Sequence, residues 1–136
     1  MNIFGKDEEE PQVEDTRVIS NSLGIDLGTS KTVIFSSSKI VLELPSAVTV
    51  DAESWEPIYF GEKAKQTLGR TPDSLSCVSP IEHGIIADYD IAEMMLKEYM
   101  KTAFGNTIIK PRIMATLPAG LTELQHHSLS KSLPVA

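Results

Sequence analysis

The sequence predicts an α/β fold that opens with an antiparallel sheet and continues into alternating helices and strands. Three observations support this prediction. Apolar β-forming runs separated by short turns rich in Gly, Ser and Thr occupy residues 23–50. A helical apolar pattern then covers residues 90–104. A further short apolar run follows, and a second helix start comes after it.

The first three strands are expected to form a meander. The run 23–27 is followed by a Gly-Thr-Ser turn and then by the apolar β-formers 33–35. Serines at 36–38 mark a second turn, after which residues 40–44 and 47–50 continue as strand. Strands joined by short turns pair antiparallel, so the chain is expected to open as a three-stranded antiparallel sheet.

Residues 51–87 are predicted to form an insertion between this sheet and the first long helix. Ile58–Phe60 is typical of a short strand and Glu62–Leu68 of a short helix, and residues 69–73 predict a loop.

The segment from Asp90 to Phe104 predicts an amphipathic helix. Asp90 and Glu93 have the spacing of a capping box, and Gly105 is a typical stop. The apolar residues fall largely on one side of this helix and are Ile91, Met94, Met95, Tyr99, Met100 and Phe104.

The remainder of the chain predicts one more strand and one more helix. Arg112–Leu117 is a short apolar run typical of a strand, residues 118–120 (Pro-Ala-Gly) predict a turn, and Thr122 is the expected cap of the next helix. The order β, β, β, α, β, α is the start of a ribonuclease-H-like fold.

The turn after the first strand has the residue types of a phosphate-binding loop. Gly28 permits a tight bend, and the amides and hydroxyls of Thr29, Ser30 and Thr32 could converge on phosphate oxygens. Asp26 would then face a hydrated Mg²⁺ ion, which keeps several waters and takes few carboxylates. The alternative is an ordinary hairpin turn, where Gly, Thr and Ser are common.

Composition favours a globular chain. Hydrophobic residues make up 41% of it, and no apolar run reaches the ~20 residues of a membrane-spanning helix. Residues 1–17 hold six acidic and two basic side chains, so four of the seven net negative charges lie there, and residues 1–20 are expected to form an acidic flexible tail. The sequence contains no basic patch, which disfavours nucleic acid as a partner.

Five segments, in order, resemble the MreB family of bacterial actin homologues. They are GIDLGTSKT (24–32), LPSAVTVD (44–51), GEKAKQTLGRTP (61–72), GIIADYDIAEMML (84–96) and KPRIMATLPAGLTEL (110–124). The resemblance implies the actin fold, and within it a truncated N-terminal lobe of an actin-like ATPase. It assigns residues 21–52 and 88–136 to subdomain IA, incomplete at its C-terminus, and residues 53–87 to the inserted subdomain IB.

The resemblance also implies a function for the whole protein. That protein would bind ATP with Mg²⁺, polymerise into filaments under the cytoplasmic membrane, and work with the cell-wall elongation machinery to direct rod shape. The first phosphate loop of that protein would consist of Asp26, Gly28, Thr29, Ser30, Lys31 and Thr32, with Asp26 facing the metal ion. The 136 residues are expected to bind nucleotide weakly alone, because they hold only part of the site.

Two residues depart from the family pattern. Pro118, Gly120 and Thr122 match a Pro-x-Gly-x-Thr-x-x-Glu motif, but Gln125 replaces its glutamate. Gln125 would orient the attacking water without acting as a base, or would only form a capping box with Thr122. Lys31 replaces the usual asparagine and would contact the β-phosphate or point outward.

The sequence also allows alternative interpretations of several residues and of the function. Arg70 and Asp73 are filament contacts or solvated loop charges, and residues 1–4 (Met-Asn-Ile-Phe) offer at most a weak peripheral membrane contact. The alternative functions are a noncatalytic interaction protein or degenerate paralogue, and another actin-fold ATPase such as a chaperone or sugar kinase. The three histidines are expected to face solvent.

Overall fold

The main sheet of the protein is a mixed sheet of four strands. The computed structural model describes residues 22–36, 39–105, 112–116 and 121–132, so the acidic tail and the Pro-Ala-Gly turn at 118–120 lie outside the described residues. The strand order is β3-β2-β1-β9, with bounds β1 (Ser22–Leu27), β2 (Lys31–Ser36), β3 (Lys39–Pro45) and β9 (Arg112–Thr116). The first three strands form the expected antiparallel meander, and β9 pairs parallel with β1.

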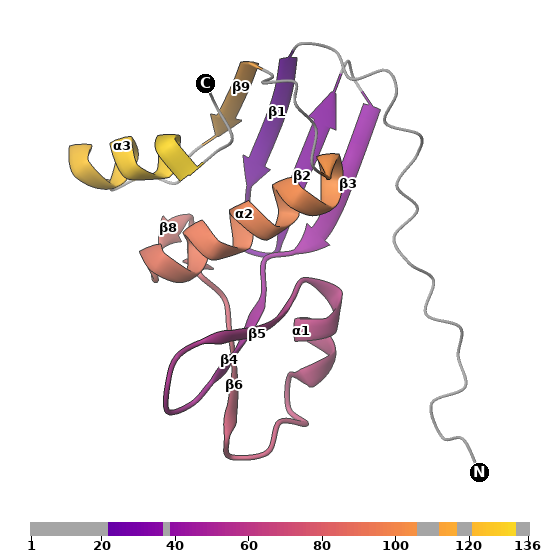
Figure 1. Ribbon diagram of the computed structural model, residues 1–136, viewed down its shortest axis with the longest axis vertical. Helices are drawn as coiled ribbons and strands as arrows, with labels where there is room; N and C mark the ends of the chain where they lie inside the picture. Colours follow the sequence, from indigo (N-terminus) through magenta and orange to yellow (C-terminus); the bar gives the residue numbers. More distant parts are fainter. Residues whose placement is uncertain (1–21, 37–38, 106–111, 117–120, 133–136) are drawn as a thin grey trace.

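Helix α2 (Tyr89–Phe104) lies across one face of this sheet (Figure 1). Successive side chains of a strand point to opposite faces, so Leu23, Ile25 and Leu27 of β1 reach the helix side and are buried. Their partners in the core include Ile34, Leu42, Ile91, Met95, Leu96, Tyr99 and Met100. The helical apolar stripe predicted from sequence is therefore the core face of α2, except that Met94 is exposed.

The opposite face of the sheet carries a row of apolar residues at one level. Gly24 pairs with Phe35 on one side and with Met114 on the other, and Phe35 pairs in turn with Ile40. The Phe35 ring lies over Gly24, where an ideal Cβ would stand 2.0 Å from a ring carbon. Glycine at this position therefore makes room for an aromatic neighbour on the adjacent strand.

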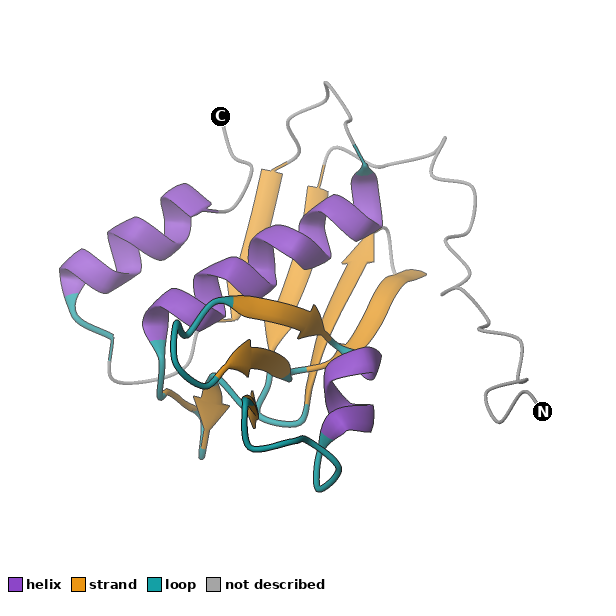
Figure 2. Cartoon of the chain, turned by 60° about the horizontal axis from the view of Figure 1, so that its bottom comes forward, coloured by secondary structure: helices purple, strands orange, loops and turns teal. Residues whose placement is uncertain are grey.

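A smaller sheet with strand order β5-β4-β6 adjoins the main sheet (Figure 2). It consists of β4 (Val48–Asp51), β5 (Pro57–Phe60) and β6 (Leu75–Val78), and is accompanied by helix α1 (Glu62–Thr67) and by a hairpin of β7 (Ile81–Glu82) and β8 (Ile85–Ile86). The predicted short strand and short helix of the insertion are confirmed. Strand β4, expected to continue the first strands, pairs with β5 and β6 instead.

Helix α2 begins at Tyr89, one residue before the predicted start at Asp90. Asp88 is its N-cap, and Asp88 Oδ1 accepts the Ile91 amide at 3.0 Å. The predicted capping box of Asp90 and Glu93 is therefore wrong. Asp88 has extended backbone angles, so the chain turns helical directly after it. The predicted stop is confirmed, because Gly105 ends the helix with φ 58°.

The Asp88 carboxylate also connects α2 to the loop between β4 and β5. Trp55, in the loop between β4 and β5, donates its indole N–H to Asp88 Oδ2 at 3.2 Å. One side chain therefore caps α2 and ties the small sheet's loop to it.

Asp88→Ala is expected to lower the free energy of unfolding by about 1–2 kcal/mol, because it removes both the cap and the indole acceptor. Urea denaturation measures this loss. Asp88→Asn keeps an oxygen for the cap but has one acceptor fewer for Trp55, so it should lose less. Equal losses in the two variants would show that the cap contributes nothing.

Candidate functional site

The carboxyl ends of β1 and β9 meet at one edge of the main sheet, as the arrowheads in Figure 1 show. Asp26 and Thr116 are register partners there, and Thr116 donates its hydroxyl to Asp26 Oδ1 at 3.0 Å. The Asp26 side chain is exposed. Thr116 therefore orients the one carboxylate that the sequence analysis placed at a metal. Sequence alone did not identify Thr116, since its place beside Asp26 depends on the parallel pairing of distant strands.

The predicted phosphate loop is the turn between β1 and β2. Gly28 N–H donates to the Lys31 carbonyl at 3.1 Å and closes the turn, leaving Thr29 and Ser30 exposed at its tip. Gly28 is required by close approach, because a Cβ there would stand 2.7 Å from the Lys31 carbonyl oxygen.

Thr32, by contrast, is fully buried. Its hydroxyl lies 2.9 Å from that of Ser46, which in turn donates to the Gly28 carbonyl at 2.7 Å. The Thr32 hydroxyl is therefore hydrogen-bonded in the interior of the protein, whereas Thr29 and Ser30 are exposed at the tip of the turn.

Thr29 also contacts the β7–β8 hairpin. Its hydroxyl oxygen accepts the Gly84 amide at 3.2 Å. The Ser79 hydroxyl lies 3.4 Å from the Thr29 carbonyl, but its one hydrogen serves the shorter 2.8 Å bond to the Ile81 carbonyl. The Thr29 hydroxyl hydrogen is not used in the bond to Gly84 and can still be donated to another acceptor.

Lys31 forms an ion pair across the sheet. Its ammonium lies 2.5 Å from Glu43 Oε1 on β3, and both side chains are largely exposed. The hydrogen bond and charge of Glu43 raise the pKa of Lys31 above its ordinary value. Glu43 takes one of the three N–H donors of the Lys31 ammonium.

Gln125 lies in the first turn of α3 (Glu123–Ser132) and completes a capping box. The backbone N–H of Gln125 donates to Thr122 Oγ1 at 3.2 Å, and the side-chain oxygen Oε1 of Gln125 accepts the backbone N–H of Thr122 at 3.1 Å. The capping alternative predicted for Gln125 is therefore present. Its side-chain NH₂ group remains able to donate, and its oxygen already accepts one hydrogen bond of the two for which it has lone pairs.

The family model described as "MreB/Mbl protein" matches residues 20–135. The chain belongs to the MreB/Mbl family. Cell shape-determining protein MreB of Escherichia coli K12 is 34% identical over 122 residues, a match covering 85% of this chain and 35% of the relative. Cell shape-determining protein Mbl of Bacillus subtilis is 32% identical over 117 residues, with the same two shares. This MreB/Mbl chain thus spans about a third of the length of these relatives.

Solved structures place the MreB/Mbl chain in the actin-like fold. MreB5 of Spiroplasma citri bound to AMPPNP superposes with a TM-score of 0.67 at 26% identity, covering 85% of this chain and 36% of that one. The MamK double helical filament superposes with a TM-score of 0.64 at 21% identity, covering 82% and 38%. The expected ribonuclease-H-like start, corresponding to the N-terminal lobe, is confirmed.

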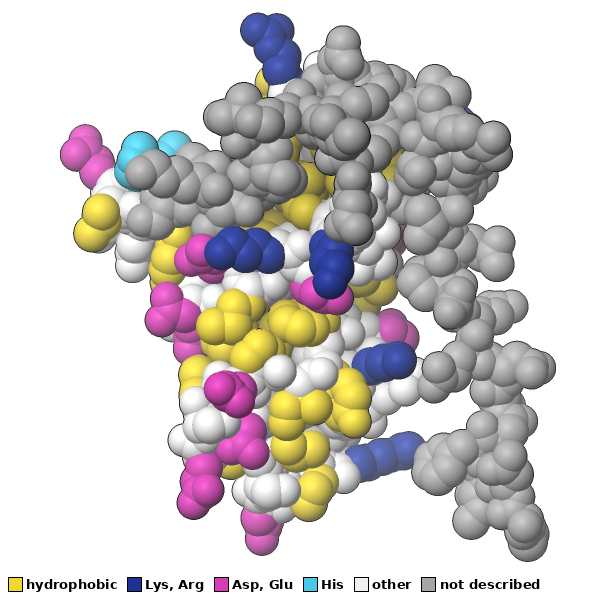
Figure 3. Space-filling model, in the orientation of Figure 1, with side chains coloured by type: hydrophobic (Ala, Val, Ile, Leu, Met, Phe, Trp, Pro, Cys, Tyr) yellow, Lys and Arg dark blue, Asp and Glu magenta, His cyan; other side chains and the backbone are white. Residues whose placement is uncertain are grey.

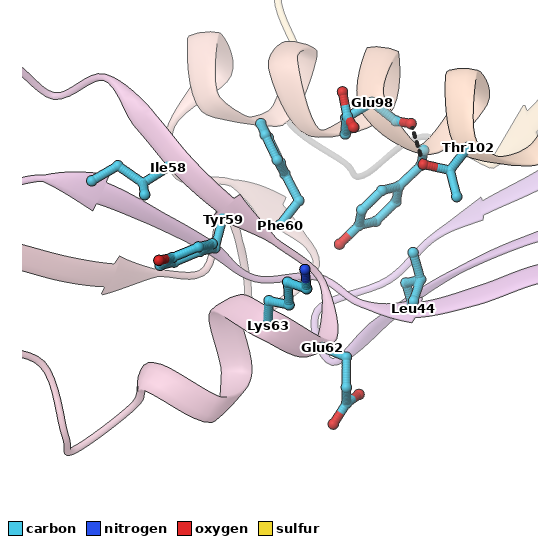
Figure 4. Close-up of a pocket in the computed structure, with 9 residues that line it drawn as sticks. Leu44, Ile58, Tyr59, Phe60, Glu62, Lys63, Glu98 and Thr102 are labelled. Carbon is cyan, nitrogen blue, oxygen red and sulfur yellow. Dashed lines mark hydrogen bonds between the residues drawn. The ribbon is translucent and has the colours of Figure 1, made fainter. Parts of the chain in front are cut away.

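The MreB/Mbl chain also has an apolar groove of about 500 Å³ between α2, β5 and the start of α1. Tyr59, Phe60 and Lys63 lie around it in Figure 4, and Figure 3 shows hydrophobic surface continuing from α2 over the small sheet. None of the predicted site residues lines this groove, so the groove is distinct from the turn between β1 and β2.

The remaining candidates of this MreB/Mbl chain are solvent-facing or structural. His83, His126 and His127 are exposed as expected, and among the described residues no three His, Cys, Asp or Glu side chains gather as a metal site. Half-buried Cys77 directs its sulfur to the Ala64 carbonyl at 3.3 Å. In the part of the chain that the structure describes, no helix has the length and apolarity needed to cross a bilayer.

Gly28→Ala is expected to destabilise the protein by about 1–3 kcal/mol, because the added methyl must push the turn open against backbone. Thermal unfolding with NMR of the turn amides measures the effect. Gly69→Ala is the control, since Gly69 has open space around it and only its φ of 72° opposes a side chain. Undisturbed amides at positions 29–31 in Gly28→Ala would contradict this.

Proposed function

We propose that the turn between β1 and β2 binds the phosphates of ATP. The observation that carries this proposal is the meeting of the carboxyl ends of β1 and β9 at Asp26 and Thr116, with the exposed Thr29–Ser30 turn directly after β1. Ligands of open α/β sheets bind outside the carboxyl ends of parallel strands. MreB5 of Spiroplasma citri, solved bound to AMPPNP and to ADP, supports the same choice of ligand.

The residues at this edge also suit a Mg²⁺ ion that accompanies the nucleotide. Mg²⁺ is usually held by one or two carboxylates together with waters and substrate phosphates. Asp26 supplies one exposed carboxylate, and Thr116 fixes its orientation. When bound, the ion would neutralise phosphate charge, while Thr29 and Ser30 would offer amides and hydroxyls.

Three further candidates would act less directly. Lys31 would donate to a phosphate with an N–H that Glu43 does not use, and Thr32 would support the turn through Ser46. Gln125 would orient the attacking water through its amide group, provided that its capping bond to Thr122 opens or is shared.

For the whole protein we propose a cytoskeletal function in cell shape, with ATP-dependent filaments at the cytoplasmic face of the membrane and contact with the wall-elongation machinery. The names of the MreB and Mbl relatives and the MamK filament support this proposal. Residues 21–52 and 88–136 would form subdomain IA, and residues 53–87 subdomain IB with filament contacts.

Titration of the ¹⁵N-labelled 136-residue chain with Mg²⁺ and ATP tests the nucleotide site. We expect millimolar affinity, because an open site leaves the adenosine unburied, and we expect the largest amide shifts at Thr29, Ser30 and Lys31. Shifts centred on the groove beside Tyr59 would contradict the proposed location, and micromolar affinity would contradict the incomplete site.

Co-sedimentation with polymerised Escherichia coli MreB tests the filament proposal. Recovery of the chain in the pellet supports it, and an Arg70→Ala/Asp73→Ala variant probes the exposed loop after α1. Absence of the chain from the pellet contradicts the filament proposal. Equal recovery of the variant assigns Arg70 and Asp73 to solvated loop charges.

A noncatalytic interaction protein is the second candidate function. The capping box supports it, because it gives Gln125 a structural role in which Oε1 accepts the Thr122 N–H. Binding to the polymer without phosphate release would favour this candidate. Phosphate release that is lost in Gln125→Ala but retained in Gln125→Glu would favour the ATPase.

A further inference from the structure

Ser46, which follows β3 directly, bonds to both ends of the β1–β2 turn. It is 2% exposed. Its backbone N–H donates to the Ser30 carbonyl at 3.0 Å, and its hydroxyl donates to the Gly28 carbonyl at 2.7 Å. No role was assigned to Ser46 from the sequence, because both of its partners come from another strand connection.

The hydrogen bonds of Ser46 form a chain with a defined direction. A serine hydroxyl has one hydrogen, and Ser46 uses it for the Gly28 carbonyl. In the 2.9 Å contact between the two hydroxyls, Thr32 is therefore the donor and Ser46 the acceptor. The chain runs from Thr32 through Ser46 to Gly28, and each such bond polarises the next one.

The two carbonyls held by Ser46 belong to the peptide groups on either side of Thr29 and Ser30. These peptide groups are trans, so the N–H of each points opposite to its C=O. The partner of the Gly28 carbonyl is the Thr29 N–H, and the partner of the Ser30 carbonyl is the Lys31 N–H. With both carbonyls directed to Ser46, both N–H groups point away from Ser46.

We infer that Ser46 is a positioning residue for phosphate binding at this turn. By holding the Gly28 and Ser30 carbonyls it fixes the Thr29 and Lys31 amides as a pair of donors to phosphoryl oxygens, in the manner of a backbone nest. The polarised Gly28 carbonyl also makes the Thr29 N–H a stronger donor. This inference rests on the proposed function of the turn and adds to it a residue that touches no ligand.

The first test compares Ser46→Ala with Thr49→Val in the 136-residue chain. Thr49 is also fully buried and shares a 2.8 Å hydroxyl contact with Thr67, but it lies in the small sheet. Both variants lose one buried hydroxyl, so both should lower the melting temperature. Only Ser46→Ala should shift the NMR resonances of the Thr29 and Lys31 amides and weaken Mg²⁺–ATP binding, by about tenfold.

Two conservative variants keep the test decisive where Ser46→Ala does not fold. Ser46→Thr retains the hydroxyl and should keep nucleotide affinity near that of the wild type even if its melting temperature falls. Ser46→Cys places a weak donor at the same position and should give an intermediate loss of affinity.

The outcomes separate this inference from the proposed function. Unchanged turn amides in Ser46→Ala, or an equal loss of affinity in Thr49→Val, would overturn the positioning role. Absence of any ATP-dependent shift in the wild type would instead overturn the proposed nucleotide site. In that case shifted Thr29 and Lys31 amide resonances in Ser46→Ala would still support the claim that Ser46 sets the conformation of the turn.

Discussion

Replacing Tyr99 with alanine is expected to lower the free energy of unfolding by about 3–5 kcal/mol. Tyr99 is 1% exposed, and its ring belongs to the core that α2 forms with the main sheet. Its hydroxyl donates to the Pro45 carbonyl, at the point where β3 ends and the chain leaves for the small sheet. Because small domains are marginally stable, this loss would leave much of the protein unfolded at 25 °C.

Tyr99→Phe separates the ring from the hydroxyl. It should cost only about 1 kcal/mol, since one hydrogen bond is lost and the ring remains. Denaturant titrations of both variants measure the difference. A loss of similar size in the two variants would show that the hydroxyl, and not the packing of the ring, dominates.

Tyr99 also predicts a loss of stability at alkaline pH. Burial raises the pKa of the Tyr99 hydroxyl above its ordinary value. Below a pH of ~10 the hydroxyl is neutral in both states, whereas above it the unfolded chain ionises first. Stability is therefore present below that pH and falls as pH rises toward the folded-state pKa. Tyr99→Phe should lessen this fall, and an unchanged alkaline profile would contradict the assignment.

Asp26→Ala is expected to weaken Mg²⁺-dependent nucleotide binding by about 10- to 100-fold. The physical reason is the loss of the exposed carboxylate that Thr116 orients at the carboxyl end of β1. NMR titration with ATP, in Mg²⁺ and in EDTA, measures the effect. The variant should bind ATP with the same affinity in Mg²⁺ as in EDTA. This affinity should equal that of the wild type in EDTA.

Asp90→Ala is the matched control for this prediction. Asp90 is an exposed carboxylate in the first turn of α2, so its removal changes the net charge equally without touching the turn after β1. Loss of binding in Asp90→Ala would indicate that overall charge decides affinity. If Mg²⁺ still raised the ATP affinity of Asp26→Ala, Asp26 would not be a ligand of the metal ion.

Local patterns in the sequence predicted most of the elements. The apolar β-forming runs on either side of the Gly-Thr-Ser turn predicted β1 and β2, and the helical apolar stripe predicted α2. Thr122 and Gln125 formed the capping box that their spacing indicates. These features depend on residues close together in the chain, which is why one sequence was sufficient.

Partnerships between distant residues could not be predicted in the same way. The apolar run of β4 signals a strand but carries no information on which sheet it joins. Asp88 and Asp90 are both plausible caps, and the choice between them is decided by where the chain leaves its extended conformation. Glu43 as the partner of Lys31, and Ser46 as the support of the turn, depend on the register of β2 with β3. The turn at residues 28–30 was therefore predictable, but its supporting contacts were not.

The parallel pairing of β1 with β9 has a consequence for how the protein folds. Ile25 and Ala115 are register partners, so this ladder forms between segments separated by the whole small sheet and α2. Long-range parallel pairing requires closure of a large loop before any contact repays its entropy, and proteins rich in such pairings fold slowly. The β1–β2–β3 meander can form early from local contacts. The edge that carries Asp26 and Thr116 would then be among the last parts of the fold to be completed.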